Sequence, residues 1–197
     1  MILLGLTGSI GMGKTTAAAM FRAEGVPVYD ADAAVHALYE TGGAAVEPIG
    51  AIFPAALRDG GVDRQVLGAL VLDDPEAMNR LEQIVHPLAR QAQEAFLHAA
   101  EQARAAVVVM DVPLLFETGG DAHMDAVAVV SAPAEVQRER VLARPGMTAE
   151  KLARILERQL PDAEKRSRAD FVISTALDLA ETRAQVRAIL AVLRDAP

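Results

Sequence analysis

The chain alternates short apolar runs with longer mixed segments that are rich in alanine. Short, near-continuous apolar runs are typical of strands that are buried on both faces of a parallel sheet, whereas alanine favours helix. We therefore predict five strands, at residues 2–7, 26–30, 106–112, 126–131 and 170–174. The mixed segments predict helices at residues 14–24, 32–40, 64–72, 75–103, 133–144, 148–160 and 178–194. This alternation predicts an α/β fold.

Residues 33–105 separate the second predicted strand from the third and are mostly helical in pattern, although glycines and prolines interrupt them. This connection is far longer than an ordinary strand-to-helix connection. We expect one domain, with a helical subdomain at about 33–105. A second segment, at about 145–168, opens with Pro145-Gly146 and is dense in arginine and lysine, which predicts a basic lid.

Composition narrows the class of protein. Hydrophobic residues make up 52%, net charge is -8, aromatic residues are 4%, and there is no cysteine. An acidic chain with few aromatic residues disfavours a nucleic-acid partner, and the lack of cysteine suits a reducing, cytoplasmic location. No apolar run is long enough to cross a membrane, and the N-terminal MILLGLTG predicts a buried strand rather than a signal peptide. We expect a monomer.

A glycine-rich segment between the first predicted strand and helix fits the phosphate-binding pattern G-x-x-x-x-G-K-[ST]. It reads GSIGMGKT, with Gly8, Gly13, Lys14 and Thr15 at the defining positions. Glycines let backbone N–H groups converge on phosphate oxygens, and a helix N-terminus favours negative charge. Lys14 is expected to reach the ATP phosphates and Thr15 to ligate Mg²⁺. The expected ATP-binding residues are Gly8, Gly11, Met12, Gly13, Lys14, Thr15 and Thr16.

Two other nucleotide-binding classes fit the sequence less well. A G-x-G-x-x-G fingerprint that begins at Gly11 requires glycine at position 16, where the chain has Thr16. A GTP switch usually carries N-K-x-D and D-x-x-G, but the single asparagine, Asn79, precedes Arg80, and no aspartate has glycine three residues later. The predicted helical insertion and basic lid instead favour a small P-loop kinase.

Further motifs make the chain resemble the dephospho-coenzyme A kinase family over nearly its whole length. The motifs that carry the resemblance are GLTGSIGMGKTT (5–16), VYDAD (28–32), DGGVDRQVL (59–67), LEQIVHP (81–87), DVPLLFE (111–117), VQRERVLAR (136–144), RQL (158–160) and RADFVIS (168–174). The resemblance implies a P-loop NTPase-type three-layer α/β/α fold with a five-stranded parallel sheet, a helical acceptor-binding insertion and a basic lid. It also implies Mg²⁺-dependent transfer of the ATP γ-phosphoryl to the ribose 3′-hydroxyl of dephospho-CoA. The alternatives are another small P-loop kinase, or an ATP-binding regulator without catalysis.

Asp30 and Asp32 lie two residues apart at the end of the second predicted strand, so we expect their side chains to share one face. By resemblance, Asp32 orients or deprotonates the acceptor hydroxyl. Asp30 is a candidate to hold a water of the Mg²⁺ shell. The alternative for Asp32 is a capping role at the N-terminus of the next helix.

Asp111 ends the third predicted strand, where a carboxylate commonly reaches Mg²⁺ directly or through water. The alternative is a carboxylate that accepts hydrogen bonds from loop amides. By resemblance, the next segment lines the acceptor pocket with Pro113, Leu114, Leu115 and Glu117. The sequence leaves open whether Glu117 is structural or binds the acceptor.

Two residues of the predicted helical subdomain are candidates for acceptor binding. His86 precedes Pro87, so its ring is either structural, bonding a carbonyl that the proline frees, or part of the acceptor site. Arg64 matches a family arginine near the acceptor, with a solvated surface arginine as the alternative.

The basic segment around the predicted lid offers catalytic cations. Its members are Arg138, Arg140, Arg144, Lys151, Arg154, Arg158, Lys165, Arg166 and Arg168. Arginines of a lid can stabilise the charge that develops on phosphoryl oxygens, and Arg140 and Arg144 are the favoured candidates. The alternative is solvated helices with pairs such as Glu150–Arg154. After the last strand the chain has Thr175 and Ala176 where the family commonly has Asn and Gly, which leaves adenine recognition open.

Overall fold

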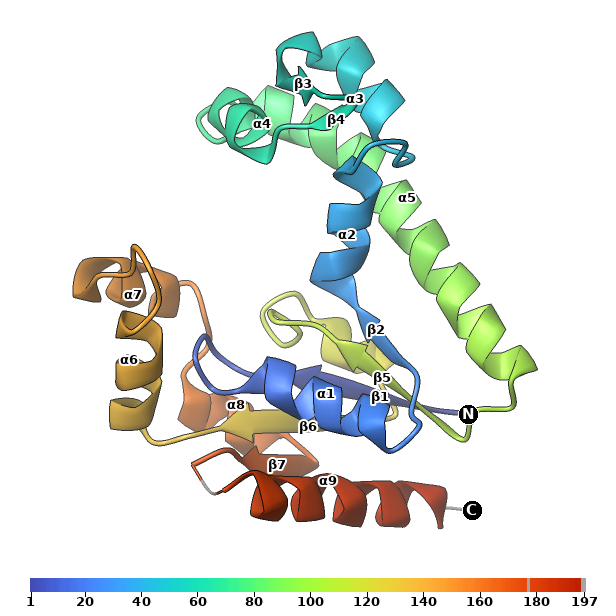
Figure 1. Cartoon of the computed structure of the whole chain (residues 1–197), viewed down its shortest axis with the longest axis vertical. Helices are drawn as coiled ribbons and strands as arrows, with labels where there is room; N and C mark the ends of the chain where they lie inside the picture. Colours follow the sequence, from blue (N-terminus) through green and yellow to red (C-terminus); the bar gives the residue numbers. More distant parts are fainter. Residues whose placement is uncertain (177, 196–197) are drawn as a thin grey trace. The chain divides into compact units, whose positions relative to one another are not determined.

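The computed structural model describes residues 1–176 and 178–195 (Figure 1). Its main sheet has five strands in the order β2-β5-β1-β6-β7. The strands are β1 (Ile2–Thr7), β2 (Val28–Asp30), β5 (Val107–Asp111), β6 (Ala126–Ser131) and β7 (Phe171–Ser174). The predicted α/β fold with a five-stranded sheet is confirmed.

The central strand β1 makes parallel pairs with β5, starting at Ile2 and Val107, and with β6, starting at Leu4 and Ala126. Both faces of this sheet are covered. Val127 and Val129 of β6 pack with the buried Leu115 and Phe116, whereas the alternate residues of β6 pack in the core that contains α1 and α9. Neighbouring residues of a strand point to opposite faces. The two clusters therefore lie on opposite faces of the sheet.

The helices include two that the sequence did not predict. The bounds are α1 (Lys14–Ala23), α2 (Ala31–Tyr39), α3 (Val46–Ile52), α4 (Arg64–Val71), α5 (Pro75–Gln102), α6 (Ala134–Leu142), α7 (Ala149–Leu156), α8 (Asp162–Arg168) and α9 (Leu179–Arg194). Helix α3 was missed because Pro48 looked like an interruption, but it lies in the first turn, where a missing N–H costs no helical bond. The predicted helix 148–160 is too long, because Gln159 and Leu160 leave it to bond Ile10 and Glu117, and α8 follows.

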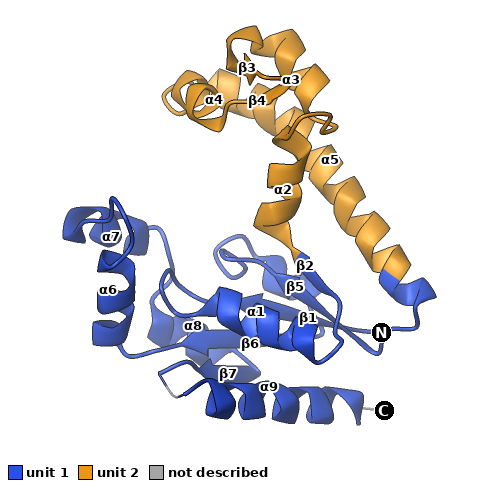
Figure 2. Ribbon diagram, in the orientation of Figure 1, with its two compact units in different colours: residues 1–29, 100–197 blue, residues 30–99 orange. Residues whose placement is uncertain are grey.

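The chain divides into two compact units, coloured in Figure 2. Unit 1 comprises residues 1–29 and 100–197 and contains the main sheet; unit 2 comprises residues 30–99. Unit 2 holds α2, α3, α4, most of α5, a 3₁₀ turn (Pro54–Ala56) and a short hairpin of β3 (Leu57–Arg58) and β4 (Gly61–Val62). It has its own apolar core, which includes Leu38, Ile49, Phe53, Leu67 and Val71.

Across the described ranges, no helix combines the length and the apolar character that a membrane span requires.

Candidate active site

The glycine-rich loop joins β1 to α1, which begins at Lys14. Gly13, the residue before the helix, has a φ of 90°, a left-handed conformation that favours glycine. Gly8 lies so close to β6 that an added Cβ would be 2.8 Å from the carbonyl oxygen of Val130. The backbone therefore requires glycine at both defining positions of the motif.

The loop keeps several backbone donors available. The N–H groups of Gly11, Gly13, Lys14 and Thr15 make no hydrogen bond to any residue in the described ranges. The N–H of Thr16, by contrast, donates to the carbonyl of Gly13 at 3.1 Å. Available amides at a helix N-terminus form a site for anions such as phosphate.

Side chains of two other segments hold the loop at Ile10. The Ile10 N–H donates to Gln159 Oε1 at 3.1 Å, and Gln137 Nε2 donates to the Ile10 carbonyl at 2.8 Å. Sequence reasoning missed both glutamines, because side-chain amides at these positions form no recognisable motif.

Lys14 and Asp111 form an ion pair at the carboxyl end of β5. Asp111 is the last residue of β5 and is buried, and its carboxylate accepts a hydrogen bond from the Lys14 ammonium. The ammonium therefore already has a counter-ion beside the loop. Thr15, the other predicted Mg²⁺ ligand in unit 1, lies one residue along α1 and is exposed.

Asp30 and Asp32 are arranged differently from the prediction. Helix α2 begins at Ala31, so Asp30 ends the strand and Asp32 lies inside the first helical turn. The expected shared face of a strand is therefore wrong. Asp30 is the N-cap, with Oδ1 accepting from the Ala33 N–H at 2.9 Å, so the capping alternative falls on Asp30 rather than Asp32. Asp32 is exposed, and its carboxylate makes no hydrogen bond or ion pair with the described residues.

Arg140 is fixed by two hydrogen bonds to one residue. From α6, its Nη1 donates to Thr175 Oγ1 at 3.0 Å and its Nη2 to the Thr175 carbonyl at 2.6 Å. Thr175 follows β7 and in turn donates its hydroxyl to the Met12 carbonyl at 2.6 Å. Arg144 is exposed, and its side chain bonds to no residue in the described part of the chain.

The remaining basic residues of the predicted lid differ in environment. Lys151 Nζ donates to the Gly146 carbonyl at 2.7 Å, and Arg168 bonds Asp121 at 2.8 Å with its guanidinium 4.4 Å from the Phe116 ring centroid. The predicted Glu150–Arg154 pair is not formed within residues 1–176 and 178–195.

The segment after β5 is largely structural. Lys165 is 0% exposed, and its Nζ lies 2.8 Å from Glu117 Oε1, which also accepts from the Leu160 N–H at 2.8 Å. Burial raises the pKa of Glu117, but the bonds from Lys165 and Leu160 outweigh it and hold that pKa below its usual value. Glu117 therefore ties this segment to α8. Of its neighbours, Leu115 is buried and Leu114 is exposed.

The carbonyl of Pro113, the first of the predicted acceptor-site residues in this segment, accepts a hydrogen bond from Thr7 Oγ1 at 3.0 Å. That bond joins the segment to the end of β1. Pro113 thus makes a structural contact, whether or not it also contacts the acceptor.

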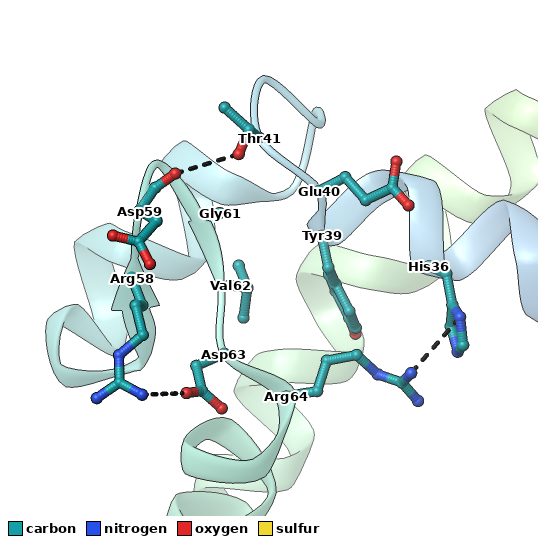
Figure 3. Close-up of a pocket in the computed structure, with 10 residues that line it drawn as sticks. All are labelled: His36, Tyr39, Glu40, Thr41, Arg58, Asp59, Gly61, Val62, Asp63 and Arg64. Atoms are coloured by element: carbon teal, nitrogen blue, oxygen red, sulfur yellow. Dashed lines mark hydrogen bonds and ion pairs between the residues drawn. The ribbon is translucent and has the colours of Figure 1, made fainter.

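Unit 2 contains an open cavity of about 680 Å³ that Arg64 helps to line (Figure 3). Arg64 Nη1 lies 3.5 Å from His36 Nδ1, and Arg58 bonds Asp63 at 3.2 Å. Burial raises the pKa of Tyr39, and the nearby Arg64 charge opposes that rise. The cavity thus combines two arginines with a histidine, a tyrosine and three carboxylates, which are those of Glu40, Asp59 and Asp63. Sequence reasoning found Arg64 but missed Arg58 of β3 and His36 and Tyr39 of α2, because no motif links these elements.

His86 does not line this cavity. It is an exposed residue of α5, and its ring makes no hydrogen bond within the described ranges. The predicted structural bond to a carbonyl freed by Pro87 is therefore wrong.

Comparison with known proteins identifies the family. A sequence model of the dephospho-CoA kinases matches residues 2–181. The dephospho-CoA kinase of Rhodopseudomonas palustris (strain HaA2) is 60% identical over 190 residues, covering 96% of this chain and 94% of that protein. A crystal structure of a Thermus thermophilus protein is 37% identical with a TM-score of 0.78, covering 98% of this chain and 97% of that one. The dephospho-CoA kinase from Campylobacter jejuni shares the fold, with a TM-score of 0.66, 23% identity, and coverage of 97% and 96%.

Given an intact phosphate-binding loop and a family match along nearly its whole length, this chain belongs to the dephospho-CoA kinase family.

Proposed function

We propose that the chain transfers the γ-phosphoryl group of ATP to the 3′-hydroxyl of the dephospho-CoA ribose, giving coenzyme A and ADP. The observation that carries the proposal is the match to the dephospho-CoA kinases over residues 2–181, which begins with a phosphate-binding loop whose donors are available.

The loop supplies the donor site. The N–H groups of Gly11, Gly13, Lys14 and Thr15, which have no partner among the described residues, are suited to phosphate oxygens. The Lys14 ammonium, paired with Asp111 in this structure, exchanges that partner for the β- and γ-phosphates when ATP binds. Gly8 shapes the loop by its close approach to Val130. The Met12 side chain is buried, with its sulfur accepting from the Ala132 N–H at 3.1 Å, so it supports the loop, and the exposed Thr16 stays a candidate for contact with ATP.

The residues beside the phosphate loop are suited to Mg²⁺ that would be bound partly by the protein and partly by the phosphates of ATP. No group of three or more His, Cys, Asp or Glu side chains in the described ranges forms a metal site on the protein alone. Mg²⁺ in kinases commonly uses one or two protein oxygens together with substrate phosphates, and the Thr15 hydroxyl and the Asp111 carboxylate supply these. Asp30 has one carboxylate oxygen in its cap and the other available for a metal-bound water. When bound, Mg²⁺ neutralises charge on the phosphates.

Unit 2 offers a candidate site for the phosphates of the acceptor. Dephospho-CoA carries a diphosphate bridge, and Arg64 of the 680 Å³ cavity, which makes no ion pair with the described residues, offers a guanidinium group that matches it. Arg58, by contrast, is paired with Asp63 in this structure. His86, Pro113, Leu114, Leu115 and Glu117 were also predicted to bind the acceptor. Of these we retain the exposed His86 and Leu114 as candidates for direct contact, because Pro113, Leu115 and Glu117 are occupied by structural contacts.

In the transfer step the 3′-oxygen forms a bond to Pγ, and the bond between Pγ and the bridging oxygen of the β-phosphate breaks. ADP leaves with that oxygen. Asp32, which has no competing partner among the described residues, accepts a hydrogen bond from the hydroxyl and takes its proton. Arg140 and Arg144 stabilise charge on the transferring group.

A coupled assay of ADP release tests the proposal. We expect ADP production that depends on dephospho-CoA and is absent with AMP, adenosine or shikimate. ADP release with one of those acceptors instead would support another small P-loop kinase. ATP binding without ADP release in the presence of any acceptor would support a regulator and overturn the proposal. A cytoplasmic location and the lack of nucleic-acid or membrane partners stay predictions from the sequence, and the monomeric state stays an expectation that nothing here tests.

A further inference from the structure

Thr175 lies at a junction of four segments of unit 1 and is 7% exposed. Its N–H donates to the Ser131 carbonyl at 2.9 Å, which links the ends of β7 and β6. Its hydroxyl donates to the Met12 carbonyl at 2.6 Å and accepts from Arg140 at 3.0 Å. One buried side chain thus joins the sheet, the phosphate loop and α6.

The bond to Met12 constrains the next amide of the loop. In a trans peptide the C=O and N–H groups point in opposite directions. Because the Met12 carbonyl points at Thr175, the Gly13 N–H points away from it, and that N–H has no partner among the described residues. The position of a Gly13 Cβ would be 3.1 Å from the Thr175 side chain, so the two residues pack closely.

The second bond orients a cation. Thr175 accepts from both terminal nitrogens of Arg140, one through its hydroxyl and one through its carbonyl at 2.6 Å. Two bonds fix the plane of a guanidinium, whereas one would leave it free to rotate. The same hydroxyl thus serves the loop amide and the arginine.

We propose that Thr175 is a positioning residue for nucleotide binding, which holds the Gly13 amide and the Arg140 guanidinium ready for the phosphates of ATP. This inference rests on the proposed function in assigning ATP to the loop. A kinase whose loop amides and arginine are oriented before ATP arrives loses less free energy in ordering them.

Calorimetric titration of MgATP, without any acceptor, tests the role of the hydroxyl. Thr175→Val keeps the shape but removes the hydroxyl, and we expect the Kd for MgATP to rise about tenfold, as for the loss of one buried hydrogen bond. Thr175→Ser keeps the hydroxyl and should restore wild-type affinity. The Ser rescue would not occur if only packing mattered.

Thr182 provides a matched control. It is 2% exposed, and its hydroxyl lies 2.9 Å from the Asp178 carbonyl and 3.3 Å from the Ser174 carbonyl, with no bond to the loop or to Arg140 in the described part of the chain. Thr182→Val should lower the melting temperature about as much as Thr175→Val while leaving the Kd for MgATP unchanged. Equal Kd values for Thr175→Val and wild type would overturn the inference, whether or not the wild type phosphorylates dephospho-CoA.

The link to Arg140 has its own test, a double-mutant cycle in kcat. Lysine cannot make both bonds to Thr175, so Arg140→Lys and Thr175→Val remove overlapping interactions. We expect the double variant to lose less than the product of the two single losses. A loss equal to that product would overturn the link to Arg140.

Discussion

Three lysines occur in the chain, and each has a different environment. Lys14 is paired with Asp111 beside the phosphate loop, Lys151 is exposed and bonds the Gly146 carbonyl, and Lys165 is buried against Glu117. From residue type alone, Lys151 and Lys165 were both predicted to belong to a basic lid. Their burial distinguishes the two, because a fully buried ammonium requires a counter-ion. Lys165 therefore contributes to the stability of the fold rather than to a lid.

Glu117→Gln tests the buried pair. Removing one charge leaves the Lys165 ammonium without a counter-ion, so we expect the free energy of unfolding to fall by about 3 kcal/mol, measured by urea denaturation. The double variant Glu117→Gln/Lys165→Met removes both charges and should recover most of that loss. If the double variant were as unstable as the single one, packing rather than the charge would explain the effect.

The same pair makes stability depend on pH. Because the folded-state pKa of Glu117 lies below the usual 4.5, its contribution is complete above about pH 4.5 and is lost as the pH falls through the lower folded value. Acid unfolding curves of the wild type should therefore be steeper below pH 4.5 than those of the double variant. Parallel curves would contradict the assigned pair.

Asp32→Asn tests the acceptor role. The substitution keeps the shape but not the charge, so we expect kcat to fall by about 10²-fold or more, within the range for lost general-base catalysis. Because Asp32 has no partner among the described residues, the melting temperature and the Kd for ATP should not change. A collapse of ATP affinity would show that Asp32 serves the donor instead.

At the scale of elements, the strands and the longer helices could be predicted, because their apolar runs and alanine-rich segments are continuous. The short elements could not. Helix α3 contains Pro48 and Gly50, which disfavour helix. Helix α8 is only seven residues long, and its buried side chain is the charged Lys165 rather than an apolar residue. Such elements are stabilised by tertiary contacts that no local pattern records.

The candidate site was predictable to the extent that it consists of motifs. The phosphate loop was found from its spacing, but the bonds of Thr175, Gln137 and Gln159 to it were not, because they join residues more than 100 positions apart. The start of the second predicted helix was misplaced by one residue, at 32 rather than Ala31, so the cap falls on Asp30 rather than on Asp32.

The cap of α2 gives a prediction at this scale. Asp30→Ala should lower the free energy of unfolding by about 1 kcal/mol, whereas Asp30→Ser, which retains a capping oxygen, should cost less. Because neither variant has the second carboxylate oxygen, both should need more Mg²⁺ for half-maximal activity. If the Mg²⁺ dependence were unchanged in both variants, Asp30 would be only the N-cap of α2 and would not hold a metal-bound water.

At the scale of the whole molecule, each unit has a separate apolar core. Ile49 in unit 2 and Ile173 in unit 1 are both 0% exposed and form a matched pair. Either change to alanine should cost about 2–5 kcal/mol. Hydrogen exchange should show lost protection mainly in residues 30–99 for Ile49→Ala and mainly in unit 1 for Ile173→Ala.

Affinity for ATP separates the two variants further. We expect Ile49→Ala to keep the wild-type Kd for ATP and Ile173→Ala to raise it, because the phosphate loop belongs to unit 1. Protection lost equally across both units in either variant would show that the cores unfold as one.

The central position of β1 has a consequence for synthesis on the ribosome. Ile2 pairs with Val107, so β1 emerges about 100 residues before its first partner strand, a delay of roughly 5–20 s at about 5–20 residues per second. During that interval its backbone donors and acceptors are unpaired and its side chains are apolar, the condition in which a nascent strand associates with other chains. The segment made in between, residues 30–99, can bury its own core meanwhile. We therefore expect the nascent chain to need protection at its first strand rather than in its helical part.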